Sequence, residues 1–129
     1  MGANKPKLLV VDDDQAVVSF LAARLGRHFD VTGTTNPRNA VEMARAEKPD
    51  VILCDINMPG MQGDDVAFAL SQDPRTATVP LIYLTALVGP EDDPDLEGVF
   101  GDYPTISKSA TTEELRDIVA SALGLPEGE

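Results

Sequence analysis

The sequence predicts an α/β domain with a doubly wound, five-stranded parallel sheet and helices on both of its faces. First, short apolar runs recur along the chain and alternate with segments whose apolar residues follow a helical spacing. Second, these runs are apolar almost throughout, as expected for strands that are buried on both faces. Third, 129 residues are enough for one domain with its own core. We expect residues 1–125 to form this domain and residues 126–129 to be a tail or the start of a linker.

The chain begins with a strand at Lys7 to Val11 (KLLVV), a nearly continuous apolar run that charged residues flank. Asp14 is expected to cap the helix that follows, because an Asp side chain can accept hydrogen bonds from the free N–H groups of a first turn. A weaker strand is expected at Phe29 to Gly33. The apolar face of the first helix comprises Val18, Leu21 and Leu25.

A second helix is predicted by Asn36 and Pro37, a capping residue followed by proline at the first helical position. This helix should continue through Ala46. The next buried strand is expected at Val51 to Cys54, and the spacing of apolar residues then predicts a helix over Gly63 to Ser71.

The fourth and fifth strands are expected at Pro80 to Leu84, where Thr85 ends the run, and at Thr105 to Ser107. The segment between them, Val88 to Tyr103, is interrupted by prolines, glycines and a run of acids. Any helix in that segment should therefore be short and weakly held.

The final helix has the clearest signals of all. Thr111 and Glu114 have the spacing of a capping box, and Gly124 is expected to end the helix. The apolar stripe of this helix comprises Leu115, Ile118, Val119, Ala122 and Leu123.

Charge and cysteine content exclude several classes of function. Lys and Arg number 10 against 22 Asp and Glu, so the formal net charge is −12 at pH 7. Such a surface repels nucleic-acid phosphates and anionic membranes, and we expect direct contact with neither. The single cysteine, Cys54, excludes an internal disulfide, and no run of about 18 apolar residues predicts a membrane-spanning helix. A cytoplasmic protein is therefore expected.

Polar residues follow four of the expected strands. Asp12 and Asp13 follow the first strand, Asp55 the third, Thr85 the fourth and Lys108 the fifth. Because ligands bind at the carboxyl ends of parallel strands, we expect these side chains to converge on one edge of the sheet. Three neighbouring carboxylates repel one another, and a hard divalent cation with oxygen ligands relieves that repulsion. The sequence therefore predicts a cation site, with Mg²⁺ the expected ion.

This arrangement suggests phosphoryl transfer. With Mg²⁺ polarising a phosphoryl group, an ionised Asp55 can attack phosphorus and form an acyl phosphate. Thr85 and Lys108 are suited to hold the other phosphoryl oxygens. Pro59 and Gly60 allow a sharp turn, so that a backbone carbonyl just past Asp55 can face the cation.

Four motifs in this order resemble the receiver domain of bacterial two-component response regulators. They are LLVVDDD, VILCDINMPGMQG around Asp55, LIYLTA around Thr85, and Lys108 about twenty residues later. The resemblance covers nearly the full chain, from Lys7 to Leu123. It implies a flavodoxin-like fold with the strand order 2-1-3-4-5.

The resemblance also implies a role for each site residue. Asp55 would accept phosphate from a histidine kinase or phosphotransfer protein, and the domain would catalyse this transfer and its own dephosphorylation. Asp13, Asp55 and the main-chain oxygen of Asn57 would bind Mg²⁺ directly, and Asp12 would contribute through water. Phosphorylation would change the surface presented to an output partner. The phosphoryl oxygens would be bound by Thr85 and Lys108.

Two positions depart from the family pattern. Three residues before Lys108, where the family usually has Tyr or Phe, this chain has Thr105, and Tyr103 lies two positions earlier. After the lysine the family usually has proline, whereas this chain has Ser109. These departures concern the output surface and the lysine loop more than the chemistry at Asp55.

Other functions are compatible with parts of the pattern. In a haloacid-dehalogenase-like phosphatase, Asp12-x-Asp14 after an apolar strand would supply the nucleophile, Asp12, but the motif around Asp55 would be unexplained. A pseudo-receiver would bind a partner without being phosphorylated, and the departures at Thr105 and Ser109 leave that alternative open. A dinucleotide-binding domain lacks its motif, because DDDQ rather than G-x-G-x-x-G follows the first strand.

Overall fold

A computed structural model describes residues 5–85, 99–100 and 103–124 of the chain. Within these residues, five parallel strands form a sheet in the order β2-β1-β3-β4-β6. Counting the parallel strands alone, this is the expected order 2-1-3-4-5, and the predicted fold class is confirmed. The parallel strands are β1 (Lys7–Val11), β2 (Asp30–Thr34), β3 (Val51–Asp55), β4 (Leu81–Thr85) and β6 (Tyr103–Ser107).

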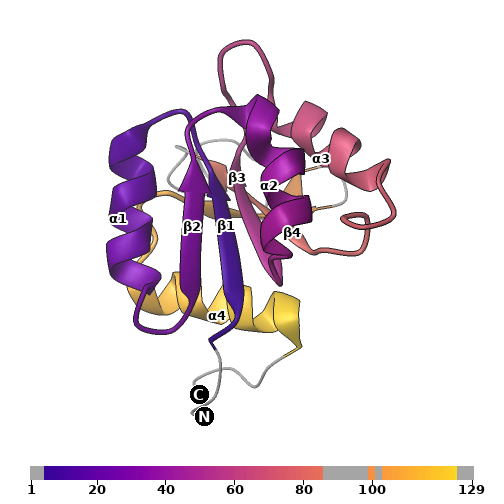
Figure 1. Cartoon of the computed structure of the whole chain (residues 1–129). Helices are drawn as coiled ribbons and strands as arrows, with labels where there is room; N and C mark the ends of the chain where they lie inside the picture. The colour runs from indigo at the N-terminus through magenta and orange to yellow at the C-terminus, as the bar shows by residue number, and fades with distance from the viewer. Residues whose placement is uncertain (1–4, 86–98, 101–102, 125–129) are drawn as a thin grey trace.

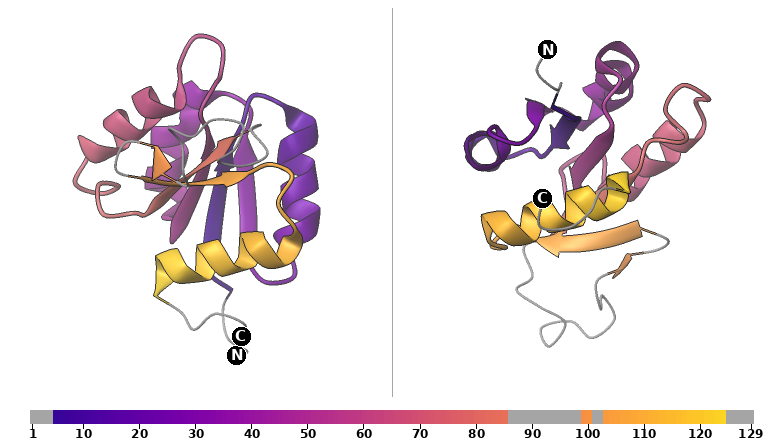
Figure 2. Two further views of the ribbon diagram at one scale, coloured as in Figure 1. Left: turned by 180° about the vertical axis from the view of Figure 1, so that it is seen from behind. Right: turned by 90° about the horizontal axis from the view of Figure 1, so that it is seen from below.

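Helices cover both faces of the sheet, as Figures 1 and 2 show. In Figure 1, α1 lies on the left of the strands, and α2 and α3 lie on the right. None of the helices that the structure describes has the length and apolarity needed to span a bilayer. The helices are α1 (Gln15–Leu25), α2 (Ala40–Glu47), α3 (Gly63–Ser71) and α4 (Thr112–Leu123), with a 3₁₀ turn, η1 (Pro37–Asn39), before α2.

The core consists of two apolar layers, one on each face of the sheet. Successive strand residues point to opposite faces, so the central strands contribute to both layers. One layer joins α2 and α3 to the sheet through Leu9, Val11, Ile52, Cys54, Tyr83, Ala44, Val66 and Leu70. The other joins α1 and α4 through Leu8, Val10, Leu53, Ile82, Leu84, Leu21, Leu25, Leu115 and Val119. The continuous apolar runs of the sequence are explained by this burial on both faces.

The helix-capping predictions are confirmed. The Asp14 side chain accepts a hydrogen bond from the Ala16 N–H at 2.9 Å. Thr111 and Glu114 form the reciprocal bonds of a capping box, at 3.1 Å and 2.8 Å. Gly124 follows the last helix in the left-handed conformation, with φ of 76°. These local contacts define the helix ends independently of the core.

Apart from shifts of one residue at the ends of some strands and helices, the structure differs from the sequence-based expectation in three places. Asn36 caps the segment that follows it, but its first turn is the 3₁₀ turn η1. The last parallel strand begins at Tyr103 rather than at Thr105. A two-residue strand, β5 (Val99–Phe100), pairs antiparallel with β6 and was not expected. The expectation of a short, weak helix between Val88 and Tyr103 falls mostly on residues 88–98 and 101–102, outside the described part of the chain.

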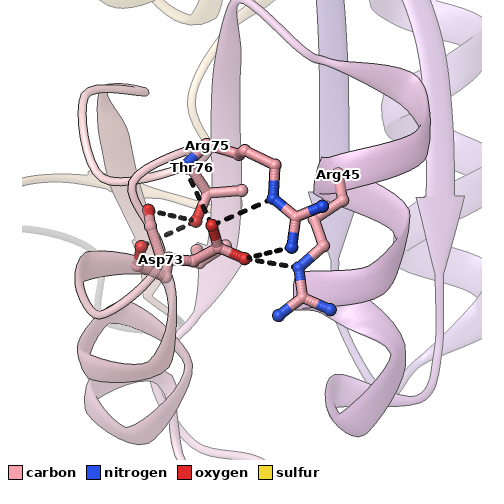
Figure 3. A network of polar contacts seen from close by, with 5 residues as sticks. Arg45, Asp73, Arg75 and Thr76 are labelled. Carbon is pink, nitrogen blue, oxygen red and sulfur yellow. Dashed lines mark hydrogen bonds and ion pairs between the residues drawn. The ribbon is translucent and has the colours of Figure 1, made fainter.

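A carboxylate in the loop after α3 connects this loop to α2 (Figure 3). Asp73 is buried, and its oxygens accept hydrogen bonds from the Arg75 N–H at 2.9 Å and from the Arg75 guanidinium. The Arg45 guanidinium of α2 donates to the same carboxylate. The Thr76 hydroxyl, in the same loop, donates to the Leu70 carbonyl at the end of α3. The Arg75 N–H and the two guanidinium groups hold the pKa of Asp73 well below its usual range.

We expect Asp73→Ala to lower the unfolding temperature by several degrees, because it leaves two guanidinium groups and one backbone N–H without their common acceptor. Thermal unfolding followed by circular dichroism measures the change. Asp30→Ala, which removes an exposed carboxylate from β2, should unfold close to the wild type. Equal unfolding temperatures for the two variants would contradict a structural role for the Asp73 contacts.

Candidate functional site

The carboxyl ends of four parallel strands carry the polar residues that the sequence singles out. Asp12 directly follows β1, Asp55 and Thr85 are the last residues of β3 and β4, and Lys108 directly follows β6. The strands are in register at this edge, where Thr85 lies opposite Ser107. Residues that are far apart in the sequence are therefore brought to one edge of the sheet.

The three carboxylates form one cluster. One oxygen from each of Asp12, Asp13 and Asp55 lies within 4.8 Å of the others. Asp12 is 0% exposed and Asp55 is 5% exposed, whereas Asp13 faces solvent. Two negative charges are thus held in a buried setting, and a third closes the cluster on its open side. Such a group is electrostatically unfavourable without a nearby cation.

The ammonium group of Lys108 lies between the two buried carboxylates. Its Nζ is 2.9 Å from Asp12 Oδ2 and 3.3 Å from Asp55 Oδ2. Burial by itself would lower the pKa of Lys108, but the carboxylates of Asp12 and Asp55 have the larger combined effect and raise it. Lys108 is therefore a cation at neutral pH and compensates part of the acidic charge.

Asp55 is the carboxylate whose ionisation the site disfavours. Burial and the neighbouring Asp12 carboxylate raise the pKa of Asp55 to about 6, although Lys108 and the Asn57 N–H act in the opposite direction. The Asn57 N–H lies 3.4 Å from Asp55 Oδ1, so it is a weak donor. Because few groups stabilise the Asp55 anion, an additional cation beside it would favour the ionised form.

One oxygen of Asp12 has the Lys108 ammonium group as its single partner among the described residues. Asp12 Oδ1 accepts a hydrogen bond from the Asp14 N–H at 2.9 Å, but Asp12 Oδ2 is fully buried and has only the ion pair with Lys108. A fully buried carboxylate oxygen with a single partner has remaining acceptor capacity, and leaving that capacity unused is unfavourable. An oxygen-liganded divalent cation would satisfy it, and few protein ligands plus several waters suit Mg²⁺. Asp13, which is exposed, supplies a carboxylate oxygen of the same cluster, and Asn57, also exposed, lies two residues after Asp55.

The loop after Asp55 turns as the sequence suggests and then packs tightly against the site. Gly60 has φ of 82°, a conformation that glycine adopts without strain. The Gly63 N–H donates to the Ile56 carbonyl at 2.8 Å, so the start of α3 lies against the site strand. A Cβ atom on Gly63 would be 2.4 Å from the Asp55 carbonyl oxygen and 3.1 Å from the Tyr83 ring. Only glycine fits there.

Sequence reasoning did not identify Gly63 as a site residue. Its signal in the sequence is a glycine at the first position of a predicted helix, where glycine has a low intrinsic preference. That signal indicates a close approach of some other group, but it does not say which group approaches. The contact with Asp55 follows from the packing of α3 against β3.

The remaining predicted residues also lie near this edge. Thr85 is half-buried, and its carbonyl accepts a hydrogen bond from the Lys108 N–H at 2.8 Å. Thr105, at the family's aromatic position, lies opposite Tyr83 in the β4–β6 ladder. The ring of Tyr103 instead packs edge-on against Tyr83, with ring centroids 5.6 Å apart. Aromatic packing on β6 is thus provided two residues earlier than the family pattern implies.

Cys54 lies beside Asp55 but belongs to the core. Its thiol is fully buried within the layer that α2 and α3 cover. Burial and the charges of Asp55 and Asp12 raise the pKa of Cys54 to about 12. The thiol is therefore protonated at neutral pH, and a redox role is disfavoured.

Residues 8–120 match the family model of the response regulator receiver domain. The response regulator PleD from Caulobacter vibrioides is 40% identical over 87 residues, which is 67% of this chain but only 19% of PleD. The protein PilH from Pseudomonas aeruginosa is 39% identical over 80 residues, 61% of this chain and 66% of PilH. The aligned part of the chain thus spans less than two thirds of these relatives' length.

Solved structures show the same fold. The chemotaxis protein CheY4 from Vibrio cholerae has a TM-score of 0.78 at 26% identity, covering 92% of this chain and 99% of CheY4. The receiver domain of the sensor histidine kinase PA1611 from Pseudomonas aeruginosa has a TM-score of 0.75 at 25% identity, covering 93% of this chain and 98% of that domain. That structure has a magnesium ion coordinated in its active site cleft.

We expect Gly63→Ala to lower the free energy of unfolding by about 1–3 kcal/mol, because the added methyl group meets backbone atoms that cannot move aside independently. Urea unfolding followed by circular dichroism measures this. Ser71→Ala, in the last turn of the same helix, should stay within about 0.5 kcal/mol of the wild type. A Gly63→Ala variant as stable as the wild type would contradict the close approach of Gly63 to the Asp55 carbonyl oxygen.

Proposed function

The chain belongs to the response regulator receiver domain family, and from that premise we propose that it is a phosphoacceptor switch in two-component signalling. Asp55 is the proposed acceptor, and a phosphohistidine of a histidine kinase or phosphotransfer protein is the proposed donor. One observation carries the proposal. A buried carboxylate with a raised pKa, Asp55, lies within reach of two further carboxylates and a lysine ammonium at one edge of the sheet.

The proposed reaction is a transfer of the phosphoryl group between two side chains. An ionised Asp55 oxygen attacks phosphorus, the new O–P bond forms, and the N–P bond of the donor histidine breaks. The imidazole leaves with the bonding electron pair and takes up a proton. Hydrolysis returns Asp55 to the unphosphorylated carboxylate, because a water oxygen attacks phosphorus and the acyl O–P bond breaks. The domain is thus a catalyst of its own modification rather than a turnover enzyme.

The acidic residues suit a magnesium site. Asp12, Asp13 and Asp55 supply carboxylate oxygens within a small volume, and we propose the main-chain oxygen of Asn57 as a further ligand. The buried Asp12 Oδ2, whose one partner among the described residues is the Lys108 ammonium group, supports a cation at this place. Mg²⁺ bound there would neutralise charge on the phosphoryl oxygens.

Two further residues are proposed to act on the transferred group. Lys108 Nζ lies 3.3 Å from Asp55 Oδ2, so its positive charge can stabilise a phosphoryl oxygen on that side chain. Thr85 ends the neighbouring strand and can donate its hydroxyl hydrogen to a second phosphoryl oxygen. Movement of these two side chains toward the phosphoryl group is the proposed origin of a changed surface for an output protein or domain.

We expect Mg²⁺ to bind the wild-type protein and Asp13→Asn to weaken this binding about tenfold or more, because the variant removes a charged ligand from the open side of the cluster. Isothermal titration calorimetry with Mg²⁺ measures the affinity. Asp30→Asn removes the same charge from an exposed residue at the amino end of β2, away from the cluster, and should bind like the wild type. Equal affinities for all three proteins would contradict a site at the three carboxylates.

We expect phosphorus-labelled acetyl phosphate with Mg²⁺ to label the wild-type protein and to leave Asp55→Asn unlabelled, because the amide cannot act as the nucleophile. Asp30→Asn is the control and should be labelled like the wild type. Gel autoradiography measures incorporation, and removal of label by hydroxylamine identifies an acyl phosphate.

Two results would overturn the proposal. Retained labelling in Asp55→Asn together with loss in Asp12→Asn would assign the nucleophile to Asp12, as in a haloacid-dehalogenase-like phosphatase. An unlabelled wild-type protein, under conditions in which Mg²⁺ binds, would indicate a pseudo-receiver that acts through binding alone.

A further inference from the structure

We propose that Ser107 is a positioning residue for Lys108 and that it acts through a pair of contacts with Ser109. The inference rests on the proposed function, in which Lys108 contacts the transferred phosphoryl group. Ser107 is the last residue of β6, Lys108 follows it, and Ser109 is exposed. We call the contacts between Ser107 and Ser109 the serine clamp.

The clamp consists of two hydrogen bonds that share one oxygen atom, Ser107 Oγ. The Ser109 N–H donates to Ser107 Oγ at 3.0 Å, and the two hydroxyl oxygens are 2.8 Å apart. The backbone turns at the same place, because the Ala110 N–H donates to the Ser107 carbonyl at 3.0 Å. Ser107 therefore holds the residue that follows Lys108 with its side chain and closes the turn with its main chain.

Lys108 lies inside this turn and is held on its other side by the sheet. Its N–H donates to the Thr85 carbonyl at 2.8 Å. The N–H of Lys108 is thus held by β4, and the N–H of the next residue is held by the clamp. The serines themselves contact neither Asp12 nor Asp55 in any hydrogen bond of the described structure, so an effect on the acidic cluster has to pass through Lys108.

The position of the lysine backbone matters because its side chain is long and flexible. A lysine stem has four rotatable carbons and loses considerable rotamer entropy when its ammonium group is held in one place. Nζ reaches Asp12 at 2.9 Å and Asp55 at 3.3 Å, two contacts that require one direction of the stem. A turn that is already closed lowers the entropy that the lysine side chain loses when it adopts this direction. Small displacements of a group that contacts the reacting atoms reduce reaction rates strongly.

The sequence also shows why this chain needs the clamp. The residue after the lysine is Ser109, which has a backbone N–H that requires an acceptor and a φ angle that no ring restricts. A proline at this position would restrict the turn covalently. Ser107 supplies the acceptor for that N–H, and the Ser109 hydroxyl adds a second contact to the same oxygen. These hydrogen bonds thus restrict the turn in place of a proline ring.

A double-mutant cycle tests the proposal. The rate of phosphorylation by acetyl phosphate with Mg²⁺ is measured for the wild type, Ser107→Ala, Lys108→Ala and the double variant. Ser107→Ala should be about threefold to tenfold slower than the wild type, which corresponds to the loss of one or two modest hydrogen bonds. In the Lys108→Ala background the same substitution should have no further effect, because there is no ammonium group left to position.

Three further variants separate positioning from a general effect on folding. Ser107→Thr keeps the hydroxyl acceptor and should restore the wild-type rate. Ser109→Ala removes only the hydroxyl contact, keeps the N–H donor, and should be slowed less than Ser107→Ala. Ser19→Ala is the matched control, because the Ser19 hydroxyl is exposed and accepts one hydrogen bond from Gln15, on α1. It should phosphorylate like the wild type.

The NMR signal of the Lys108 ammonium group provides a test that needs no phosphorylation. Assigned by its absence in Lys108→Ala, this signal should be sharp in the wild type, broadened by exchange with water in Ser107→Ala, and sharp again in Ser107→Thr. An unchanged signal in Ser107→Ala would overturn the inference, and so would an equal slowing by Ser107→Ala in both backgrounds of the cycle. A wild-type protein that accepts no phosphate would refute the proposed function, while the ammonium signal would still decide for or against the clamp.

Discussion

Electrostatic repulsion among carboxylates at the end of a parallel sheet is the constraint on which the site depends. Asp12 and Asp55 are buried, and one oxygen of each lies within 4.8 Å of the other and of Asp13. Within the described residues, the compensating charge is the Lys108 ammonium group. One positive charge beside three negative ones leaves the cluster under-compensated, and burial together with the Asp12 carboxylate raises the pKa of Asp55. A site of this kind has a strong preference for an added cation.

Packing of the apolar core holds these charges together despite their repulsion. The strands that bear the carboxylates are buried on both faces, so the ends of β1 and β3 cannot separate to relieve the repulsion. Gly63 fixes α3 directly against the Asp55 backbone, and the Lys108 N–H is tied to the Thr85 carbonyl. The same packing that stabilises the domain therefore forces unfavourable charges together at one edge.

Residues whose placement follows from strand order could be predicted from the sequence. Asp12, Asp55, Thr85 and Lys108 each stand at the end of an apolar run, and the rule that parallel strands end at one edge is enough to bring them together. The helix caps could be predicted as well, because they depend on neighbours in the sequence. Strand β5 could not be, since two residues carry no periodicity.

Contacts that depend on tertiary packing were likewise beyond the sequence. The fit of Gly63 against Asp55 requires knowing how closely α3 approaches β3. The two bonds between Ser107 and Ser109 require knowing the path of the chain after β6, where the family pattern offers no guide. The 3₁₀ turn before α2 is a third case, because a good cap and a proline are compatible with either kind of helix.

Asp73 and Asp55 are both buried carboxylates, but their surroundings differ in a way that matters for the proposed chemistry. The Asp73 carboxylate accepts hydrogen bonds from a backbone N–H and two guanidinium groups, and its pKa is lowered. Its lone pairs are occupied, so it has little capacity to attack another group. Asp55 has one weak backbone donor and one shared ammonium group, and its pKa is raised. An under-solvated anion beside a place for a cation is a better nucleophile, and on this ground the proposed chemistry is assigned to Asp55.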